Sequence, residues 1–115
     1  MPLVRACLQR QKTCFAAVFS PSTNQTIHQG AAMKIALLSD LHLSVHPLDA
    51  PLHTGADVVV LAGDLHRPAQ AMAWARQFAQ PTLYVAGNHE FYGSDLVSTL
   101  AQLREQAQGS TVRVL

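Results

Sequence analysis

Residues 57–64 read Asp-Val-Val-Val-Leu-Ala-Gly-Asp, an aliphatic run that ends in a glycine and an acidic residue. A run without polar alternation predicts a strand that is covered on both faces, as in a parallel sheet. The arrangement recurs on either side. Residues 34–42 read Lys-Ile-Ala-Leu-Leu-Ser-Asp-Leu-His, and residues 82–90 read Thr-Leu-Tyr-Val-Ala-Gly-Asn-His-Glu. The chain is therefore expected to repeat a unit in which a buried strand ends in polar residues.

Two of the segments that follow these strands carry helix signals. Pro68 can occupy the first turn of one helix, and apolar residues at helical spacing predict its buried face. These residues are Ala71, Trp74, Ala75 and Phe78. A second helix is expected to be capped by Ser94 and to end at Gly109. Its predicted buried face comprises Leu96, Leu100, Leu103 and Ala107. Pro47 and Pro51 argue against a long helix between the first two strands.

The order of these elements predicts the fold class. Strands are expected at residues 34–39, 57–62, 82–86 and 111–115, which implies parallel pairing through right-handed crossovers. We therefore expect an α/β fold with a mostly parallel sheet and flanking helices. Ligands bind beyond the carboxyl ends of the strands in such sheets. Asp40, Asp64 and Asn88 follow successive strands at two equal intervals of 24 residues, so they should meet at one edge.

Composition limits the kinds of protein that the chain can be. Its 115 residues are 49% hydrophobic and 13% charged, which indicates one globular domain. No apolar run approaches the ~20 residues of a membrane span, and a net charge of +1 gives no nucleic-acid signal. We therefore expect neither a membrane nor a nucleic acid as a partner. The two cysteines, Cys7 and Cys14, do not make a zinc site, and the cysteine-free remainder fits a cytoplasmic location.

The first 32 residues differ from the remainder. They hold three basic and no acidic residues, whereas residues 33–115 hold five basic and seven acidic residues. We predict a loosely ordered N-terminal extension over residues 1–32, which contains a strand-like run at residues 14–19. The basic start would also fit a transit peptide, or a start site placed too early, since Met33 precedes the first expected strand directly.

The residues after the strands are of types that bind metals and move protons. Asp40 and His42 would point to the same side of an extended chain and could bind one transition metal. Asp64 follows a buried strand, where a carboxylate is costly unless it is paired or metal-bound. Asn88 offers an oxygen ligand, and His89 can act as an acid near neutral pH. Taken singly, each could be an ordinary turn or capping residue, but their order and spacing favour a shared site.

The sequence leaves the roles of five neighbouring residues more open. Glu90 can orient a neighbouring ring or backbone group. His66 lies two residues after an aspartate and could face the same crevice, and Arg67 could bind a phosphate. A solvated loop at a helix N-terminus is the more typical setting for both of them. Phe91 and Tyr92 could line a pocket or pack in the core.

Together the three segments resemble the calcineurin-like metallophosphoesterase superfamily. The family pattern is Asp-x-His, Gly-Asp and Gly-Asn-His-Asp/Glu, and it is matched here by residues 40–42, 63–64 and 87–90. The likeness covers about residues 33–115, the N-terminal half of the usual domain. It implies the first half of an αββα sandwich and hydrolysis of phosphate mono- or diesters with two divalent ions, by ligand type Mn, Fe or Zn.

The resemblance also implies a role for each matching residue. Asp40 and His42 would bind the first metal, and Asp64 would bridge both metals. Asn88 would bind the second metal and contact the substrate phosphate. His89 would donate a proton to the leaving group and contact the substrate.

The chain also departs from the family pattern. The family's later histidine segments normally lie beyond Leu115, and no histidine follows Glu90. The Asp-Arg-Gly segment of protein serine/threonine phosphatases is absent after Asp64. We therefore expect a truncated domain over residues 33–115, with one sheet face uncovered and a missing half that could lie in the downstream reading frame. The alternatives are a catalytically silent binding module, an inactive fragment, or a flavodoxin-like domain without metals.

Overall fold

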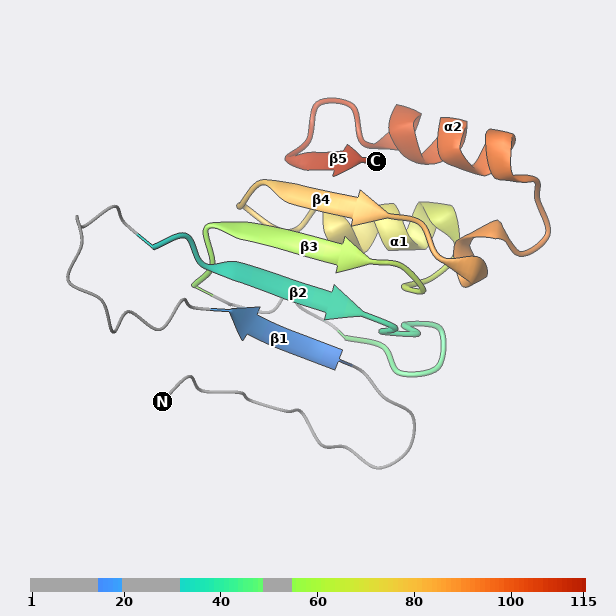
Figure 1. Ribbon diagram of the computed structural model, residues 1–115. Helices are drawn as coiled ribbons and strands as arrows, with labels where there is room; N and C mark the ends of the chain where they lie inside the picture. Colours follow the sequence, from blue (N-terminus) through green and yellow to red (C-terminus); the bar gives the residue numbers. More distant parts are fainter. Residues whose placement is uncertain (1–14, 20–31, 49–54) are drawn as a thin grey trace.

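The strands lie side by side in the order in which they occur along the chain (Figure 1). The structure is a computed structural model that describes residues 15–19, 32–48 and 55–115. Its elements are β1 (Phe15–Phe19), β2 (Ile35–Ser39), β3 (Val58–Ala62), α1 (Pro68–Ala75), β4 (Thr82–Val85), the 3-10 helix η1 (Asn88–Phe91), α2 (Leu96–Gln106) and β5 (Val112–Val114). β2 to β5 pair in parallel. The predicted α/β fold with a mostly parallel sheet and flanking helices is confirmed.

The sheet has an additional antiparallel strand at one edge. β1 pairs with β2 in a register that places Phe15 opposite Ser39 and Phe19 opposite Ile35. The strand-like run near the start of the chain therefore joins the sheet. The other residues of the predicted extension before residue 32 lie outside the described part, so its expected loose order stays a prediction.

One face of the sheet is covered by helices and is buried, except at the edge, where Val114 is partly buried. Ala36, Val59, Thr82 and Val112 are register partners across the four parallel strands and form one buried row. A second row comprises Leu38, Leu61, Tyr84 and Val114. Both rows pack in a core that includes the predicted stripe, namely Ala71, Trp74 and Ala75 of α1 and Phe78, which lies just after the end of this helix. The core location predicted for Trp74 is confirmed by its edge-to-face contact with Phe78 at 5.2 Å.

The start of α2 differs from the prediction. Asp95, and not Ser94, caps the helix, because its carboxylate accepts a hydrogen bond from the Ser98 backbone N–H. Leu96 is 58% exposed, whereas Thr99 is buried together with Leu103 and Ala107. Residues 92–98 are all exposed, so the first turn of α2 lies outside the core. The periodicity identified the buried face but not the point at which the helix meets the core.

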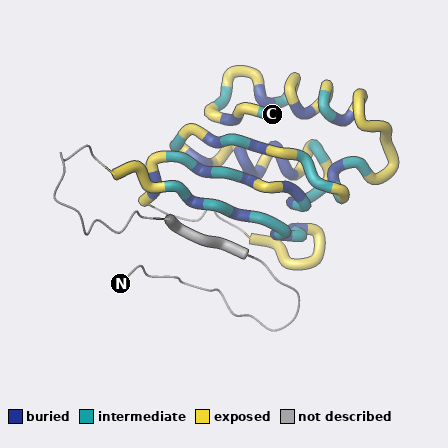
Figure 2. Tube along the Cα trace, viewed as in Figure 1, coloured by how far each residue is buried: buried dark blue, intermediate teal, exposed yellow. Residues whose placement is uncertain are grey.

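The opposite face of the sheet is apolar but only partly shielded. Alternate strand residues on it are half-buried or exposed (Figure 2). They are Ile35, Leu37, Val58, Val60, Leu83 and Val85. No helix of the described residues lies on this face (Figure 1). The strands are therefore apolar on both faces, as their sequences indicate, while the described helices cover only one. Within the described part of the chain, no helix has both the length and the apolar character needed to cross a membrane.

Candidate metal and catalytic site

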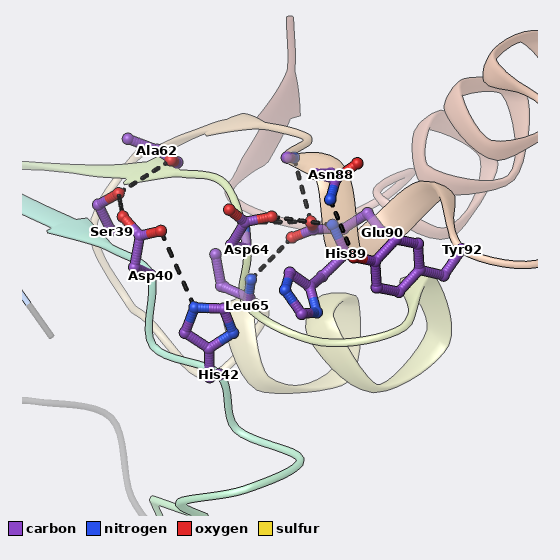
Figure 3. A network of polar contacts seen from close by, with 11 residues as sticks. Ser39, Asp40, His42, Ala62, Asp64, Leu65, Asn88, His89, Glu90 and Tyr92 are labelled. Carbon is purple, nitrogen blue, oxygen red and sulfur yellow. Dashed lines mark hydrogen bonds and ion pairs between the residues drawn. The ribbon is translucent and has the colours of Figure 1, made fainter. Parts of the chain in front are cut away.

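The loops after β2, β3 and β4 meet at the carboxyl edge of the sheet (Figure 3). Backbone hydrogen bonds connect the loops after β2 and β3 directly. The Asp40 N–H donates to the Gly63 carbonyl at 3.1 Å, and the His42 N–H donates to the Asp64 carbonyl at 3.0 Å. Side chains that are 24 residues apart in sequence are thereby placed at one edge, as the spacing predicted.

Three of the predicted ligands have left-handed backbone conformations. The φ angles of Asp40, His42 and Asp64 are 54°, 45° and 55°. Residues other than glycine pay about 1–3 kcal/mol for such a conformation, which persists where the surrounding structure over-determines it and which clusters at functional sites. The three angles are the positive values among the non-glycine residues of the described segments, so the backbone strain of these segments is concentrated in the candidate site.

Asp40 and His42 form the exposed side of the site. The Asp40 Oδ1 atom lies 3.9 Å from the His42 Nε2 atom, and the two side chains are 45% and 29% exposed, respectively. The argument from an extended chain does not describe how they meet, because the positive φ angles bend the backbone there. Ser39, which the sequence argument passed over, donates its hydroxyl hydrogen bond to the other oxygen of Asp40.

The loops after β3 and β4 approach each other through two glycines. A Cβ atom added at Gly87 would lie 2.4 Å from the Asp64 nitrogen and 2.5 Å from its Oδ1 atom. Gly63, with a φ of 81°, faces Gly87 in the same way, since an added Cβ would lie 2.8 Å from the Gly87 Cα. This contact allows the Asp64 Oδ1 atom to accept a hydrogen bond from the His89 backbone N–H at 2.9 Å.

A buried carboxylate lies beneath these two loops. Glu90 is 0% exposed. Its Oε1 atom accepts hydrogen bonds from the Leu65 N–H at 2.9 Å and the Tyr84 hydroxyl at 2.7 Å. Its Oε2 atom accepts from the Asp64 and Gly87 N–H groups, both at 3.1 Å. The orienting role suggested for Glu90 thus has four specific partners. Tyr84 was missed, although a buried tyrosine needs a partner for its hydroxyl.

The tyrosine in this network is held in its protonated form. Burial raises the pKa of Tyr84 far above its ordinary value, and the negative charge of Glu90 and its hydrogen bond raise it further. The hydroxyl therefore donates to the carboxylate at any pH at which proteins normally work.

Aromatic rings surround His89. Its ring lies 4.5 Å from the His42 ring in an edge-to-face arrangement and 4.8 Å from the Tyr92 ring, measured between centroids. The Asn88 side-chain nitrogen donates to the Tyr92 hydroxyl at 3.0 Å, which directs the amide oxygen elsewhere. Of the two readings for Tyr92, the pocket reading applies, because this residue lines a small cavity and is 47% exposed.

The cavity beside His89 has a basic and aromatic lining. Its volume is about 50 Å³, and it is lined by His42, Ser44, Leu65, His66, Arg67, His89 and Tyr92. Arg67 donates a hydrogen bond to the Tyr92 carbonyl and lies 5.9 Å from the centre of the Tyr92 ring. The structure therefore brings both His66 and Arg67 to the same crevice as the predicted acid.

The donor chemistry fits a cation, while the protein ligand set is partial. Bonds of about 2.0–2.2 Å from nitrogen and oxygen would let one ion contact both the Asp40 and His42 atoms that lie 3.9 Å apart. Asp64 and Asn88 add oxygen donors of the type that divalent metals accept. Across residues 32–48 and 55–115, however, no three side chains of the His, Cys, Asp and Glu types gather closely enough to hold a metal ion.

Comparison with known families agrees with the fold and the motif order. Residues 33–114 match the calcineurin-like phosphoesterase superfamily domain, in keeping with the N-terminal part of that domain. Because the match spans well over half of the sequence, the chain belongs to this superfamily. Membership identifies a phosphoesterase-type hydrolase at the level of the family. Searches among curated proteins and among solved structures gave no match.

Proposed function

We propose that this chain is a phosphoesterase that cleaves phosphate mono- or diesters with the help of two divalent metal ions. One observation carries the proposal: the three loops that match the family bring five donor or acid residues to one edge of the sheet. These residues are Asp40, His42, Asp64, Asn88 and His89. Mn, Fe or Zn ions suit such a mixture of carboxylate, amide and imidazole ligands.

Each residue would have a separate task in binding the ions. Asp40 and His42 would hold the first ion, as their 3.9 Å separation allows. Asp64 would bridge the two ions through the oxygen that the His89 N–H does not occupy. Asn88 would bind the second ion through its amide oxygen, since its nitrogen is directed at Tyr92. The bound ions would act as Lewis acids on the phosphate and supply the nucleophile.

The remaining residues would act on the substrate itself. His89 would donate a proton to the leaving oxygen, and its place between the rings of His42 and Tyr92 restricts the directions in which the imidazole can point. Asn88 would contact the phosphate. Arg67, which borders the same cavity, would bind a phosphate oxygen through guanidinium donors that the Tyr92 carbonyl does not use.

A second candidate is a silent metallophosphoesterase-like module or an inactive fragment. The partial ligand set favours it, because the described residues offer no cluster of three strong metal-binding side chains. We therefore expect this chain by itself to bind Mn²⁺ weakly and to turn over substrate slowly.

The test is hydrolysis of p-nitrophenyl phosphate and bis-p-nitrophenyl phosphate with and without Mn²⁺. Asp64→Asn should lower any Mn²⁺-dependent turnover at least about tenfold, the size of effect seen even for residues that only support metal ligands. Asp57→Asn is the matched control, because Asp57 lies before β3 and binds the Lys34 N–H at 2.8 Å. Turnover that Asp64→Asn leaves unchanged would contradict the proposal. Saturable Mn²⁺ binding without turnover would favour the silent module.

A further inference from the structure

We propose that Glu90 and Tyr84 form a positioning pair that fixes the loop after β3 against the loop after β4. This inference rests on the proposed metal site, because its consequence is the relative placement of Asp64 and Asn88. We refer to Glu90, Tyr84 and their hydrogen bonds as the clasp. Neither residue would contact a metal or the substrate.

The clasp connects three separate segments through one carboxylate. Asp64 and Leu65 donate backbone hydrogen bonds from the loop after β3, and Gly87 donates one from the loop after β4. Tyr84 donates from the interior of β4. Four donors therefore converge on two oxygens, and all four distances lie between 2.7 and 3.1 Å. Charge-assisted hydrogen bonds of this kind are about twice as strong as neutral ones.

Asp64 is held from both ends by this arrangement. Its backbone nitrogen donates to Glu90 at 3.1 Å, while its side-chain Oδ1 atom accepts from the His89 nitrogen at 2.9 Å. The contact between the two glycines leaves no room for a side chain at either position, so the two loop backbones lie close together. A shift of Glu90 would consequently move Asp64 relative to Asn88 and His89. Functional constellations tolerate a displacement of only about 0.5 Å.

Tyr84 supplies the side-chain donor that keeps Glu90 in place. It is 0% exposed, and its position in the buried row of β4 anchors the clasp in the hydrophobic core. Loss of its hydroxyl would leave the Oε1 atom with the Leu65 N–H alone. The carboxylate would then be held by three backbone N–H groups alone, so its position, and with it the geometry of the neighbouring loop, would be less tightly fixed.

The test compares Tyr84→Phe with Thr82→Val. Thr82 lies on the same strand and the same buried face, is 1% exposed, and donates its hydroxyl to the Gln80 carbonyl at 3.0 Å. Its replacement removes a partly buried hydrogen bond at the opposite end of the strand from the site. Both variants should lose stability, but only Tyr84→Phe should change the site.

Two measurements separate positioning from stability. In metal-free protein, Tyr84→Phe should accelerate hydrogen exchange of the Asp64 and Leu65 amides about tenfold more than Thr82→Val, as expected for a weakened charge-assisted hydrogen bond. In Mn²⁺ titrations followed by paramagnetic broadening of amide signals, it should weaken binding by about 10–100-fold, the usual cost of losing a residue that orients a ligand. Thr82→Val should leave the Mn²⁺ affinity unchanged.

Glu90→Gln provides a second variant in case Tyr84→Phe does not fold. The glutamine oxygen can still accept from the Asp64 and Gly87 N–H groups, and the Tyr84 hydroxyl can rotate to accept from the glutamine NH₂ group. Only the Leu65 bond lacks a counterpart. Leu65 exchange should therefore accelerate more than Asp64 exchange in this variant.

The possible results distinguish the clasp from the proposed function. Equal exchange rates and equal Mn²⁺ affinities in Tyr84→Phe and Thr82→Val would overturn the clasp while leaving the metal site intact. Absence of Mn²⁺ broadening in the unmodified protein would overturn the proposed function. In that case the selective acceleration of Asp64 and Leu65 amide exchange in Tyr84→Phe would still decide whether Glu90 and Tyr84 position the loops.

Discussion

The loops on the two sides of the candidate site are held in different ways. The loops after β3 and β4 close over Glu90, which is fully buried and accepts four hydrogen bonds. The loop after β2 is attached through backbone hydrogen bonds to its neighbour. Its Asp40 has a positive φ angle and a side chain that is 45% exposed. The central ligands are thus tied to a buried carboxylate, whereas the outer pair is placed by backbone hydrogen bonds to the neighbouring loop.

The largest effect should come from Gly87→Ala, which changes the contact between the loops after β3 and β4, the fixed side of the site. The new Cβ atom would lie 2.4 Å from the Asp64 nitrogen, a backbone atom that cannot move without breaking its bond to Glu90. We expect a loss of about 3 kcal/mol in the free energy of unfolding, at the upper end for overpacked sites. Urea denaturation measures it. A loss below about 1 kcal/mol would show that the two loops can move apart enough to accommodate the new Cβ atom.

Asp40→Gly, in the loop after β2 that forms the outer side of the site, should affect metal binding but hardly affect stability. Glycine accepts the positive φ angle of 54° without strain, and this gain offsets the greater flexibility of its unfolded chain. The free energy of unfolding should therefore change by less than about 1 kcal/mol, while Mn²⁺-induced broadening at His42 should disappear. Asp40→Asn, which keeps the side-chain shape, serves as the control for charge. A destabilisation as large as that of Gly87→Ala would remove the distinction between the two sides.

Alkaline pH should lower the free energy of unfolding through Tyr84, which belongs to the fixed side of the site. The pKa of Tyr84 is raised by burial and by Glu90, so its contribution to stability is fully present below the ordinary tyrosine pKa of about 10. That contribution is lost as the pH rises above this value, because the unfolded chain ionises first. Thermal melting between neutral and strongly alkaline pH should show a decline that Tyr84→Phe reduces. An identical decline in both proteins would argue against a buried, protonated Tyr84.

The smallest effect is expected at Asp95, which lies outside both sides of the site. Its hydrogen bonds with Ser98 lower the pKa of the Asp95 carboxyl. The resulting stability is present above the ordinary aspartate pKa and is lost as the pH falls through the lowered value. Asp95→Ala should slightly lower the melting temperature at neutral pH and abolish this acid dependence. Asp95→Asn should retain the cap and lose only the pH dependence.

The sequence alone predicted the parts of this structure that depend on local patterns. Apolar runs located the four parallel strands, and the equal intervals placed Asp40, Asp64 and Asn88 at one edge. The contacts between loops were harder to predict from the sequence. Glu90 was recognised only as a group that could orient a neighbour, because its four donors come from positions up to 26 residues away. The cap at Asp95 and the exposure of Leu96 depend on where α2 meets the core, which periodicity does not specify.

The strictly sequential order of the strands has a consequence for how the site assembles. Each parallel strand pairs with the strands next to it in the chain, so the sheet can grow by adding one neighbour at a time. The Asp40–Gly63 bond requires β2 and β3 to be paired, whereas the clasp requires β3 and β4. All of the proposed ligands are assembled only after both pairings exist. A metal ion would thus bind a late species on the folding route and, by mass action, draw earlier species toward the native state.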